Sequence, residues 1–198
     1  MGYIEEEQKN AEYERARKRA MYLLGSRDYS VRALREKLLK NYTPETAERV
    51  IDDMTRYGFL DDENYGKKLA ASLIKGKKYG LYRAKTEMKR KGVPQSIIDD
   101  ALGEYEADDY LEQLKTLIRK KYLGKIYDTD GRRKTVNALV RRGFGFTEIK
   151  KAVLEVLKEE AEDEDEEGYQ DEDDDSDEGN DNGDGYCEDV NVNEEEEE

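Results

Sequence analysis

Apolar residues recur at intervals of three and four from about residue 15 to residue 158. The clearest examples are Leu34, Leu38, Ala47, Val50, Ile51, Met54, Leu111, Leu114, Leu117 and Ile118. This spacing places the apolar side chains on one face of a helix. Pro44 and Pro94 each stand at the start of a helical segment, and no stretch shows the sustained alternation of a half-buried strand. The pattern therefore predicts an all-α protein without a sheet.

A repeat of about 50 residues accompanies the helical pattern. Segments that begin at Tyr42, Val93 and Phe144 align with one another at a spacing of 51 residues. The same offset relates Ala47, Ile98 and Ile149. Such a period is typical of tandem helical units, and each unit has room for three helices of roughly 10–14 residues. We expect three three-helix units, over residues 15–58, 59–104 and 105–158.

The residues between the predicted helices suit helix ends. One set follows basic helices and tolerates the left-handed conformation that closes a helix, namely Asn41, Gly92 and Gly143. Thr43 before Pro44 suits the start of a helix. Gly58 is expected to end one helix, Asp61 to cap the next, and Leu60 to pack on Tyr65 as a hydrophobic staple.

The formal net charge of −15 conceals an uneven distribution. All 35 Lys and Arg residues lie in residues 1–158 with 26 of the 50 acidic residues, so that part carries a charge of +9. Residues 159–198 hold the other 24 acidic residues and no basic one. Because that segment has too little apolar surface to offset the entropy of ordering, we expect a disordered acidic tail over 159–198. Residues 1–14 are expected to be a partly ordered lead-in.

The composition removes several kinds of chemistry. The chain has no His and a single Cys, Cys187, so imidazole catalysis, a disulfide framework and a CxxC zinc site are excluded. The acid pairs Asp61-Asp62 and Asp99-Asp100 are interpreted as a helix start and a solvated face, because no phosphate loop or second ligand type accompanies them. We expect no catalytic residue, no cofactor and no metal. The N-terminus lacks the apolar core of a signal peptide and no window approaches about 18 apolar residues, which predicts a soluble protein of a reducing compartment.

Basic residues are concentrated in the second helix of each predicted unit. The thirteen candidates for contact with a partner are Arg32, Arg35, Lys37, Arg83, Lys85, Lys89, Arg90, Lys91, Arg132, Arg133, Lys134, Arg141 and Arg142. Tyrosines interleave with them at positions 79, 82, 122 and 127. For any one residue an ordinary solvated helix face is the simpler interpretation, but recurrence in all three units favours contact with a polyanion or an acidic protein groove. Four other tyrosines, Tyr22, Tyr57, Tyr65 and Tyr110, lie at apolar-periodic positions and are expected in the core.

Several of these motifs resemble the RecX family of RecA regulators. The resemblance begins with Tyr22-Leu23-Leu24, Arg27-Asp28-Tyr29-Ser30 and Leu34-Arg35-Glu36-Lys37-Leu38. It continues through the segment Gly58–Tyr65, then Lys91-Gly92-Val93, Ile97–Leu102 and Arg141–Phe144. The family-signature positions are Gly58, Leu60, Asp61, Asp62, Gly92 and Gly143. The resemblance covers about residues 17–157 and depends on the order and spacing of these motifs together.

The resemblance implies an elongated, curved array of three three-helix repeats and a bacterial cytoplasmic protein without catalytic residues. It implies binding to RecA along the groove of the RecA–DNA filament, with modulation, usually inhibition, of recombinase and coprotease activity. An elongated monomer suits this role, and direct contact with single- or double-stranded DNA stays open. The family pattern does not include the acidic tail, which either competes with a polyanion for the basic helices or only increases solubility. The alternatives are a stand-alone DNA-binding helical module and an acidic-tailed chaperone or scaffold.

Overall fold

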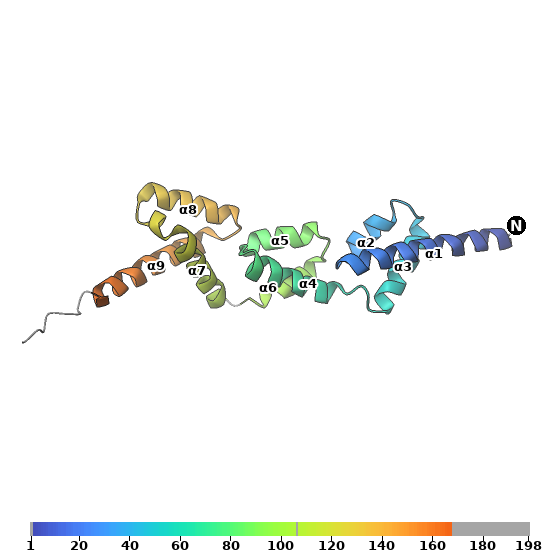
Figure 1. Cartoon of the computed structure of the whole chain (residues 1–198), viewed down its shortest axis with the longest axis horizontal. Helices are drawn as coiled ribbons and strands as arrows, with labels where there is room; N and C mark the ends of the chain where they lie inside the picture. The colour runs from blue at the N-terminus through green and yellow to red at the C-terminus, as the bar shows by residue number, and fades with distance from the viewer. Residues whose placement is uncertain (1, 106, 168–198) are drawn as a thin grey trace, which may run out of the picture.

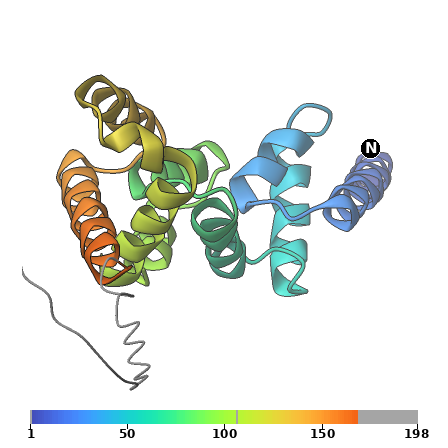
Figure 2. The same ribbon diagram turned by 60° about the vertical axis from the view of Figure 1, so that its left-hand side comes forward.

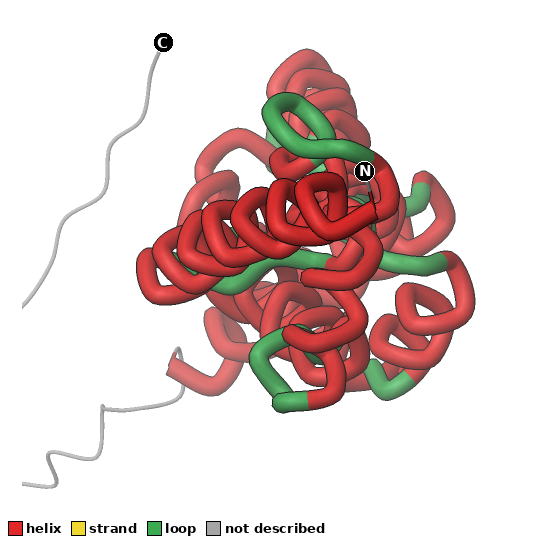
Figure 3. The backbone as a smooth tube through the Cα atoms, turned by 90° about the vertical axis from the view of Figure 1, so that its right-hand side faces the viewer, coloured by secondary structure: helices red, strands yellow, loops and turns green. Residues whose placement is uncertain are grey.

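The computed structural model describes residues 2–105 and 107–167, which form helices and the turns between them (Figures 1 and 3). The described α-helices are α1 (Gly2–Ser26), α2 (Val31–Leu38), α3 (Pro44–Arg56), α4 (Asp62–Ala71), α5 (Leu81–Arg90), α6 (Gln95–Gly103), α7 (Ala107–Ile126), α8 (Thr129–Arg141) and α9 (Phe146–Glu167). A π-helical segment, η1 (Ser72–Gly76), continues α4. These residues contain no strand, so the predicted all-α fold is confirmed.

The helices form three units in tandem, each with its own apolar core. The first core, between α1, α2 and α3, includes Leu34, Leu38 and Met54. The second, between α4, η1, α5 and α6, includes Ile74, Met88 and Ile98. The third, between α7, α8 and α9, includes Leu114, Leu139 and Ile149. The most extensive helix packing occurs within units, and the units follow one another along an elongated array with α1 and α9 at opposite ends (Figures 1 and 2).

The 51-residue repeat corresponds to equivalent helices. The third helices of the units begin at Pro44, Gln95 and Phe146, at the predicted spacing. One detail differs from the expectation, because Leu60 is buried in the first core whereas Tyr65 packs against the second. These two side chains therefore do not share a core, and the predicted hydrophobic staple does not form.

Most of the predicted helix ends have the expected geometry. Asp61 caps α4 by accepting a hydrogen bond from the backbone N–H of Asn64 at 2.9 Å, and Pro44 occupies the first turn of α3. Asn41 is an exception, because it does not adopt the expected left-handed conformation. Among the described non-glycine residues, positive φ occurs at Lys78. The first unit instead closes α2 with a bond from the Tyr42 N–H to the Leu38 carbonyl, at 3.0 Å.

The N-terminal residues are helical. Residues 2–14, expected as a partly ordered lead-in, are the first half of α1. Tertiary contacts hold this half in place: Glu12 accepts a 2.7 Å hydrogen bond from the backbone N–H of Thr43, and the Tyr13 hydroxyl donates to Asp53. The Arg49 guanidinium lies 4.3 Å from the centre of the Tyr13 ring. These contacts join α1 to α3, and the polar composition of the segment gave no indication of them.

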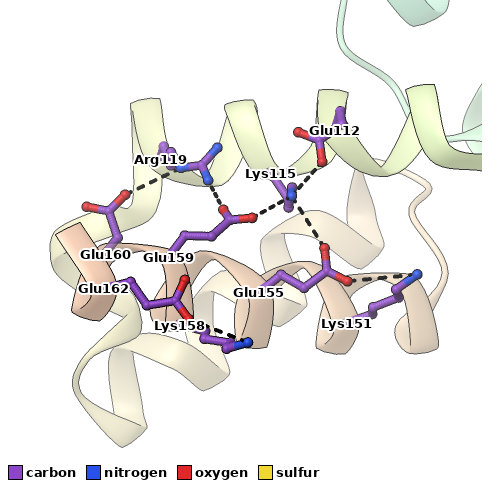
Figure 4. Close-up of polar contacts among 9 residues, drawn as sticks. All are labelled: Glu112, Lys115, Arg119, Lys151, Glu155, Lys158, Glu159, Glu160 and Glu162. Atoms are coloured by element: carbon purple, nitrogen blue, oxygen red, sulfur yellow. Dashed lines mark hydrogen bonds and ion pairs between the residues drawn. The ribbon is translucent and has the colours of Figure 1, made fainter.

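The acidic end of α9 is likewise helical, which corrects the expected start of the disordered tail at residue 159. Lys115 of α7 lies in the interface with α9, where its side chain is 7% exposed. Its Nζ is 2.5 Å from Glu112, 3.4 Å from Glu155 and 2.8 Å from Glu159 (Figure 4). Residues 159–167 therefore extend the helix, because carboxylates there pair with cations of α7. The rest of the expected tail, residues 168–198, lies outside the described residues.

The same network shifts two pKa values in opposite directions. Hydrogen bonds to Glu112 and Glu159 raise the pKa of Lys115, and the hydrogen bond from Lys115 lowers the pKa of Glu159. Arg119 adds a second cation, since it pairs with Glu159 and lies 3.4 Å from Glu160. Both partners of the central pair are thus held in their charged forms at neutral pH.

Replacing Glu159 tests whether the acidic end of α9 stabilises the fold. We expect Glu159→Gln to lower the free energy of unfolding by about 1 kcal/mol at pH 7, measured by urea denaturation, because the Lys115 ammonium loses an anionic partner. Since the folded pKa of Glu159 is lowered, this difference is present above the ordinary value of 4.5 and disappears as the pH falls through the folded pKa.

Glu162→Gln is the matched control, because Glu162 makes a 3.5 Å pair with Lys158 between two exposed side chains. Its effect should be a few tenths of a kcal/mol at most. An equal loss in both variants, or a difference that persists in acid, would contradict a specific role for Glu159.

Candidate functional site

The candidate basic residues lie on or beside α2, α5 and α8, the middle helices of the three units. Each of these helices buries a narrow apolar stripe, and the buried residues are Leu34 and Leu38, Ala84 and Met88, and Thr135 and Leu139. The remaining faces carry the charged side chains. The three helices follow one another along one side of the array in the order α8, α5, α2 (Figure 1).

Some candidate cations brace a middle helix against a neighbour within its own unit. Arg35 binds Glu48 of α3 through two hydrogen bonds, at 2.6 and 2.9 Å. Lys85 binds Asp99 of α6 at 2.8 Å, which is the equivalent pair in the second unit. The bond from Lys85 lowers the pKa of Asp99. These exposed pairs also show that Asp99 has a structural partner, in keeping with the solvated face expected for it.

Other candidates make local contacts. Arg90 pairs with Glu87 at 2.7 Å, three residues earlier on α5. Arg133 and Lys134 both pair with Asp130, at 2.8 and 2.6 Å. The guanidinium of Arg132 donates to the Ile126 carbonyl at the end of α7, at 2.9 Å. These four side chains are thus engaged near their own helices.

The first joint between units places the start of α2 on the end of α5. Ser30 caps α2 through the Ala33 N–H, and its hydroxyl also donates to the Lys91 carbonyl at 2.8 Å. Arg32 donates to the Lys89 carbonyl at 2.7 Å. The last carbonyls of α5 lack partners within their helix, so the preceding unit supplies them. We call this contact joint 1.

Asp62 completes joint 1 from the second unit. Its carboxylate accepts a 2.9 Å hydrogen bond from the Val31 N–H, one of the unpaired donors at the start of α2. Burial raises the pKa of Asp62, while the bond from Val31 opposes that shift. A signature residue that the sequence placed at a helix start therefore stabilises the start of a different helix, in the neighbouring unit.

The second joint repeats this arrangement between α5 and α8, and we call it joint 2. The Gly80 N–H donates to the Arg142 carbonyl at 2.8 Å, and the Tyr82 N–H to the Gly143 carbonyl at 3.1 Å. Arg83 donates to the Arg141 carbonyl at 3.3 Å, just as Arg32 donates to the Lys89 carbonyl in joint 1.

A tyrosine takes the place of Asp62 in joint 2. The Tyr110 hydroxyl accepts from the Leu81 N–H at 3.1 Å, and burial raises the pKa of Tyr110 to about 12. Gln113 of α7 donates to the Ile74 carbonyl of η1 at 2.9 Å. Side chains from the start of α7 thus fix the second unit on the third.

Two separate structural requirements explain why glycine occupies the signature positions. Gly58, Gly92 and Gly143 all have positive φ, at 74°, 89° and 90°, as the predicted helix closures require. A Cβ on Gly143 would also lie 2.4 Å from the Arg83 backbone nitrogen, and one on Gly92 would lie 2.5 Å from the Ser30 hydroxyl. No atom lies within 4 Å of the corresponding position at Gly58. Glycine is therefore needed at the two joints for close approach as well as for backbone conformation.

The structure brings together only part of the candidate set. Arg32 meets Lys89 and Lys91 at joint 1, and Arg83 meets Arg141 and Arg142 at joint 2. Lys37 is exposed and makes no ion pair with the side chains that the structure describes. Sequence reasoning missed Lys77, Lys78 and Gly80, and it named Ser30 as part of a family motif without assigning it a contact. The available signal was the run of lysines and glycines from Lys75 to Gly80 between two predicted helices.

Two of the four tyrosines expected in the core are exposed. Tyr110 is buried and Tyr65 is half-buried, but Tyr22 is 71% and Tyr57 is 61% exposed. The apolar stripe of α1 runs through Ala16, Ala20 and Leu23, which leaves Tyr22 outside it. Tyr57 follows the last residue of α3, so the helical spacing that suggested burial has already ended there.

Among the side chains that the structure describes, no three with metal-ligating atoms gather in one place. None of the helices in residues 2–105 and 107–167 offers an apolar stretch of the length that a bilayer requires.

Comparison with known proteins identifies the family. Residues 16–54 match the family model for the first three-helix domain of RecX, and residues 61–102 match that for the second. Regulatory protein RecX of Trichlorobacter lovleyi is 35% identical over 130 residues, covering 63% of this chain and 84% of that protein. The chain belongs to the RecX family. The RecX protein of Prosthecochloris aestuarii is 33% identical over 144 residues, covering 72% of this chain and 94% of that protein.

Solved RecX structures have the same fold. The crystal structure of RecX from Lactobacillus salivarius aligns with a TM-score of 0.68 at 19% identity, covering 74% of this chain and 97% of that one. A second crystal structure of regulatory protein RecX gives a TM-score of 0.65, also at 19% identity. The array of three-helix units is therefore the fold of the RecX family.

Two glycine substitutions separate close approach from backbone strain. Gly80 has an ordinary φ of −73°, but a Cβ there would lie 2.1 Å from the Gly143 carbonyl oxygen. We expect Gly80→Ala to open joint 2, to change the small-angle X-ray scattering curve, and to lower the free energy of unfolding by about 1–3 kcal/mol.

Gly58→Ala is the control, because it adds strain at positive φ without any clash. It should cost about 1 kcal/mol and leave the scattering curve unchanged. A Gly80→Ala protein that scatters like the parent would show that joint 2 tolerates the extra atom.

Proposed function

We propose that this chain is a non-enzymatic regulator of RecA in the bacterial cytoplasm. It binds along the groove of the RecA–DNA filament and modulates, in the inhibitory direction, recombinase and coprotease activity. Membership of the RecX family supports the regulatory role, since the curated relatives are named regulatory proteins. The pattern of side chains supports a binding role over a catalytic one, because Asp61, Asp62 and Asp99 serve as helix caps and ion-pair partners.

The observation that carries this proposal is the end-to-end connection of the three units. A protein that binds along a filament groove needs length and a fixed shape more than it needs a deep pocket. Joints 1 and 2 supply that shape, because helix ends of one unit are hydrogen-bonded to helix ends of the next. An elongated monomer with this shape meets successive subunits of a filament without a second copy of itself.

The alternative function is a DNA-binding helical module that acts without RecA. A helix that reads bases places several side chains into one groove of the duplex. Several basic side chains on α2, α5 and α8 instead bind carboxylates or carbonyls of this same chain. This use of the cations favours the proposal over the alternative.

Filament binding gives a direct test. We expect the full chain to co-sediment with RecA filaments on single-stranded DNA and to slow RecA ATP hydrolysis and strand exchange. Gly80→Ala should weaken co-sedimentation by roughly tenfold, the effect of losing about 1.4 kcal/mol of binding free energy, because the array no longer matches the groove. Gly58→Ala should bind like the parent.

Two results would contradict the proposal. A protein that neither sediments with the filaments nor changes RecA activity does not act on RecA. Equal affinity for naked DNA and for the filament, falling steeply with salt concentration, would instead support the DNA-binding alternative.

A further inference from the structure

Five basic residues belong to the segments that meet at joint 2, namely Lys77, Lys78, Arg83, Arg141 and Arg142, and we call them the joint-2 cations. Arg83 donates to the Arg141 carbonyl at 3.3 Å, and Arg142 lies 3.5 Å from the Lys78 carbonyl. Two of the cations face one aromatic ring: the Arg83 guanidinium is 4.2 Å and the Lys77 ammonium 5.9 Å from the centre of the Tyr79 ring. These contacts place the group around one backbone junction.

The carboxylates whose side chains the structure describes form no ion pair within 4.0 Å with a joint-2 cation. The nearby Glu87 is held by Arg90 at 2.7 Å. The pKa of Glu87 is lowered chiefly by Arg90 and further by the charges of Arg83 and Lys77. An excess of positive charge in one part of the surface favours the binding of an anion there.

Joint 1 differs from joint 2 in its charges. At the 50-residue offset that relates Ser30 to Gly80, the counterpart of Asp28 is Lys78, so an acidic position has become a basic one. The pair between Arg32 and Glu36 in joint 1, at 3.6 Å, corresponds at the 51-residue offset to Arg83 and Glu87, but Glu87 is held by Arg90 at 2.7 Å.

The chain itself carries an anion that complements this site. Residues 168–198 contain 16 acidic residues and no Lys or Arg. They follow α9, whose first residue, Phe146, comes three residues after Gly143 of joint 2. The 22 residues of α9 span about 33 Å, and Lys115 and Arg119 hold the acidic end of the helix on α7.

The covalent connection makes the return to joint 2 feasible. A segment of 31 residues reaches about 100 Å when extended, three times the length of α9. A linked partner of this kind is present at an effective concentration of the order of millimolar, so a modest affinity is sufficient. A separate nucleic acid has no such advantage.

We propose that the acidic segment 168–198 docks on the joint-2 cations of the same molecule. The docked segment covers Lys77, Lys78 and Arg141, whose exposed side chains are not used to hold the joint together. It therefore competes with any other polyanion for this surface. The docking is intramolecular and does not depend on the proposed action on RecA.

The single cysteine of the chain, Cys187, lies within this acidic segment and allows a direct test. A benzophenone maleimide on Cys187 of the full chain is illuminated at low protein concentration, and the cross-linked peptides are mapped by mass spectrometry. We expect most cross-links to fall on peptides from joint 2, and to decrease at least threefold in 0.5 M NaCl because salt screens the attraction.

Charge-neutralising variants identify the surface. The triple variant Lys77→Gln, Lys78→Gln, Arg141→Gln should lose the joint-2 cross-links while it keeps the thermal unfolding temperature of the parent. The matched control Lys37→Gln, Lys89→Gln, Lys91→Gln removes three exposed charges from the first unit and joint 1, and should keep the cross-links.

Three outcomes would overturn the proposal. The first is cross-links spread over the surface in proportion to exposure, and the second is equal cross-linking in the two triple variants. The third is cross-linking that increases with protein concentration, as contacts between molecules do. Binding of a 20-nucleotide oligonucleotide at joint 2 without any cross-link there would assign the surface to nucleic acid instead.

Discussion

The close approach of backbones at the two joints is the constraint on which the rest of the molecule depends. Helix packing is extensive inside each unit, and the units are joined by hydrogen bonds at helix ends and, between the second and third units, by Leu81, which packs against both cores. Each bond contributes about 0.5–1.5 kcal/mol, and the start of one helix meets the end of another, which aligns their dipoles favourably. At joint 2, only glycine at positions 80 and 143 lets the two backbone segments come this close, because a Cβ at either position would clash with backbone atoms of the other segment.

This constraint determines what the basic residues are available to do. Arg32 and Arg83 project from equivalent turns and both donate to carbonyls that would otherwise lack partners. Arg35 and Lys85 hold the middle helices on the third helices. A charged side chain that supports the array in this way is not free to bind a partner, so the recurrence of cations in every unit reflects construction as much as recognition. The cations left over are unequal between the joints, because Lys78 stands where the first unit has Asp28.

The sequence predicts best what one helix or one turn decides locally. Helix periodicity, the 51-residue offset, the Asp61 cap and the positive φ of the signature glycines all follow from nearby residues. Contacts between distant segments could not be predicted from the sequence. Asp62 has a helix-start position in the sequence, yet its acceptor role serves Val31 of the preceding unit. Residues 2–14 and 159–167 have the composition of disordered chain, yet they are helical, and Tyr13, Glu159 and Glu160 within them have partners in Asp53, Lys115 and Arg119.

The helical extension of α9 also changes the meaning of the charge distribution. When the boundary moves from residue 158 to residue 167, eight acidic residues join the helical part, whose charge falls from +9 to +1, and −16 remains for residues 168–198. An almost neutral array has little long-range attraction for a polyanion, so binding depends on where charges are left unpaired. Glu155, Glu159 and Glu160 of α9 are paired with Lys115 and Arg119 of α7. Pairing within the third unit thus leaves the joint-2 cations without these carboxylates. A cationic surface therefore remains on a chain whose total charge is strongly negative.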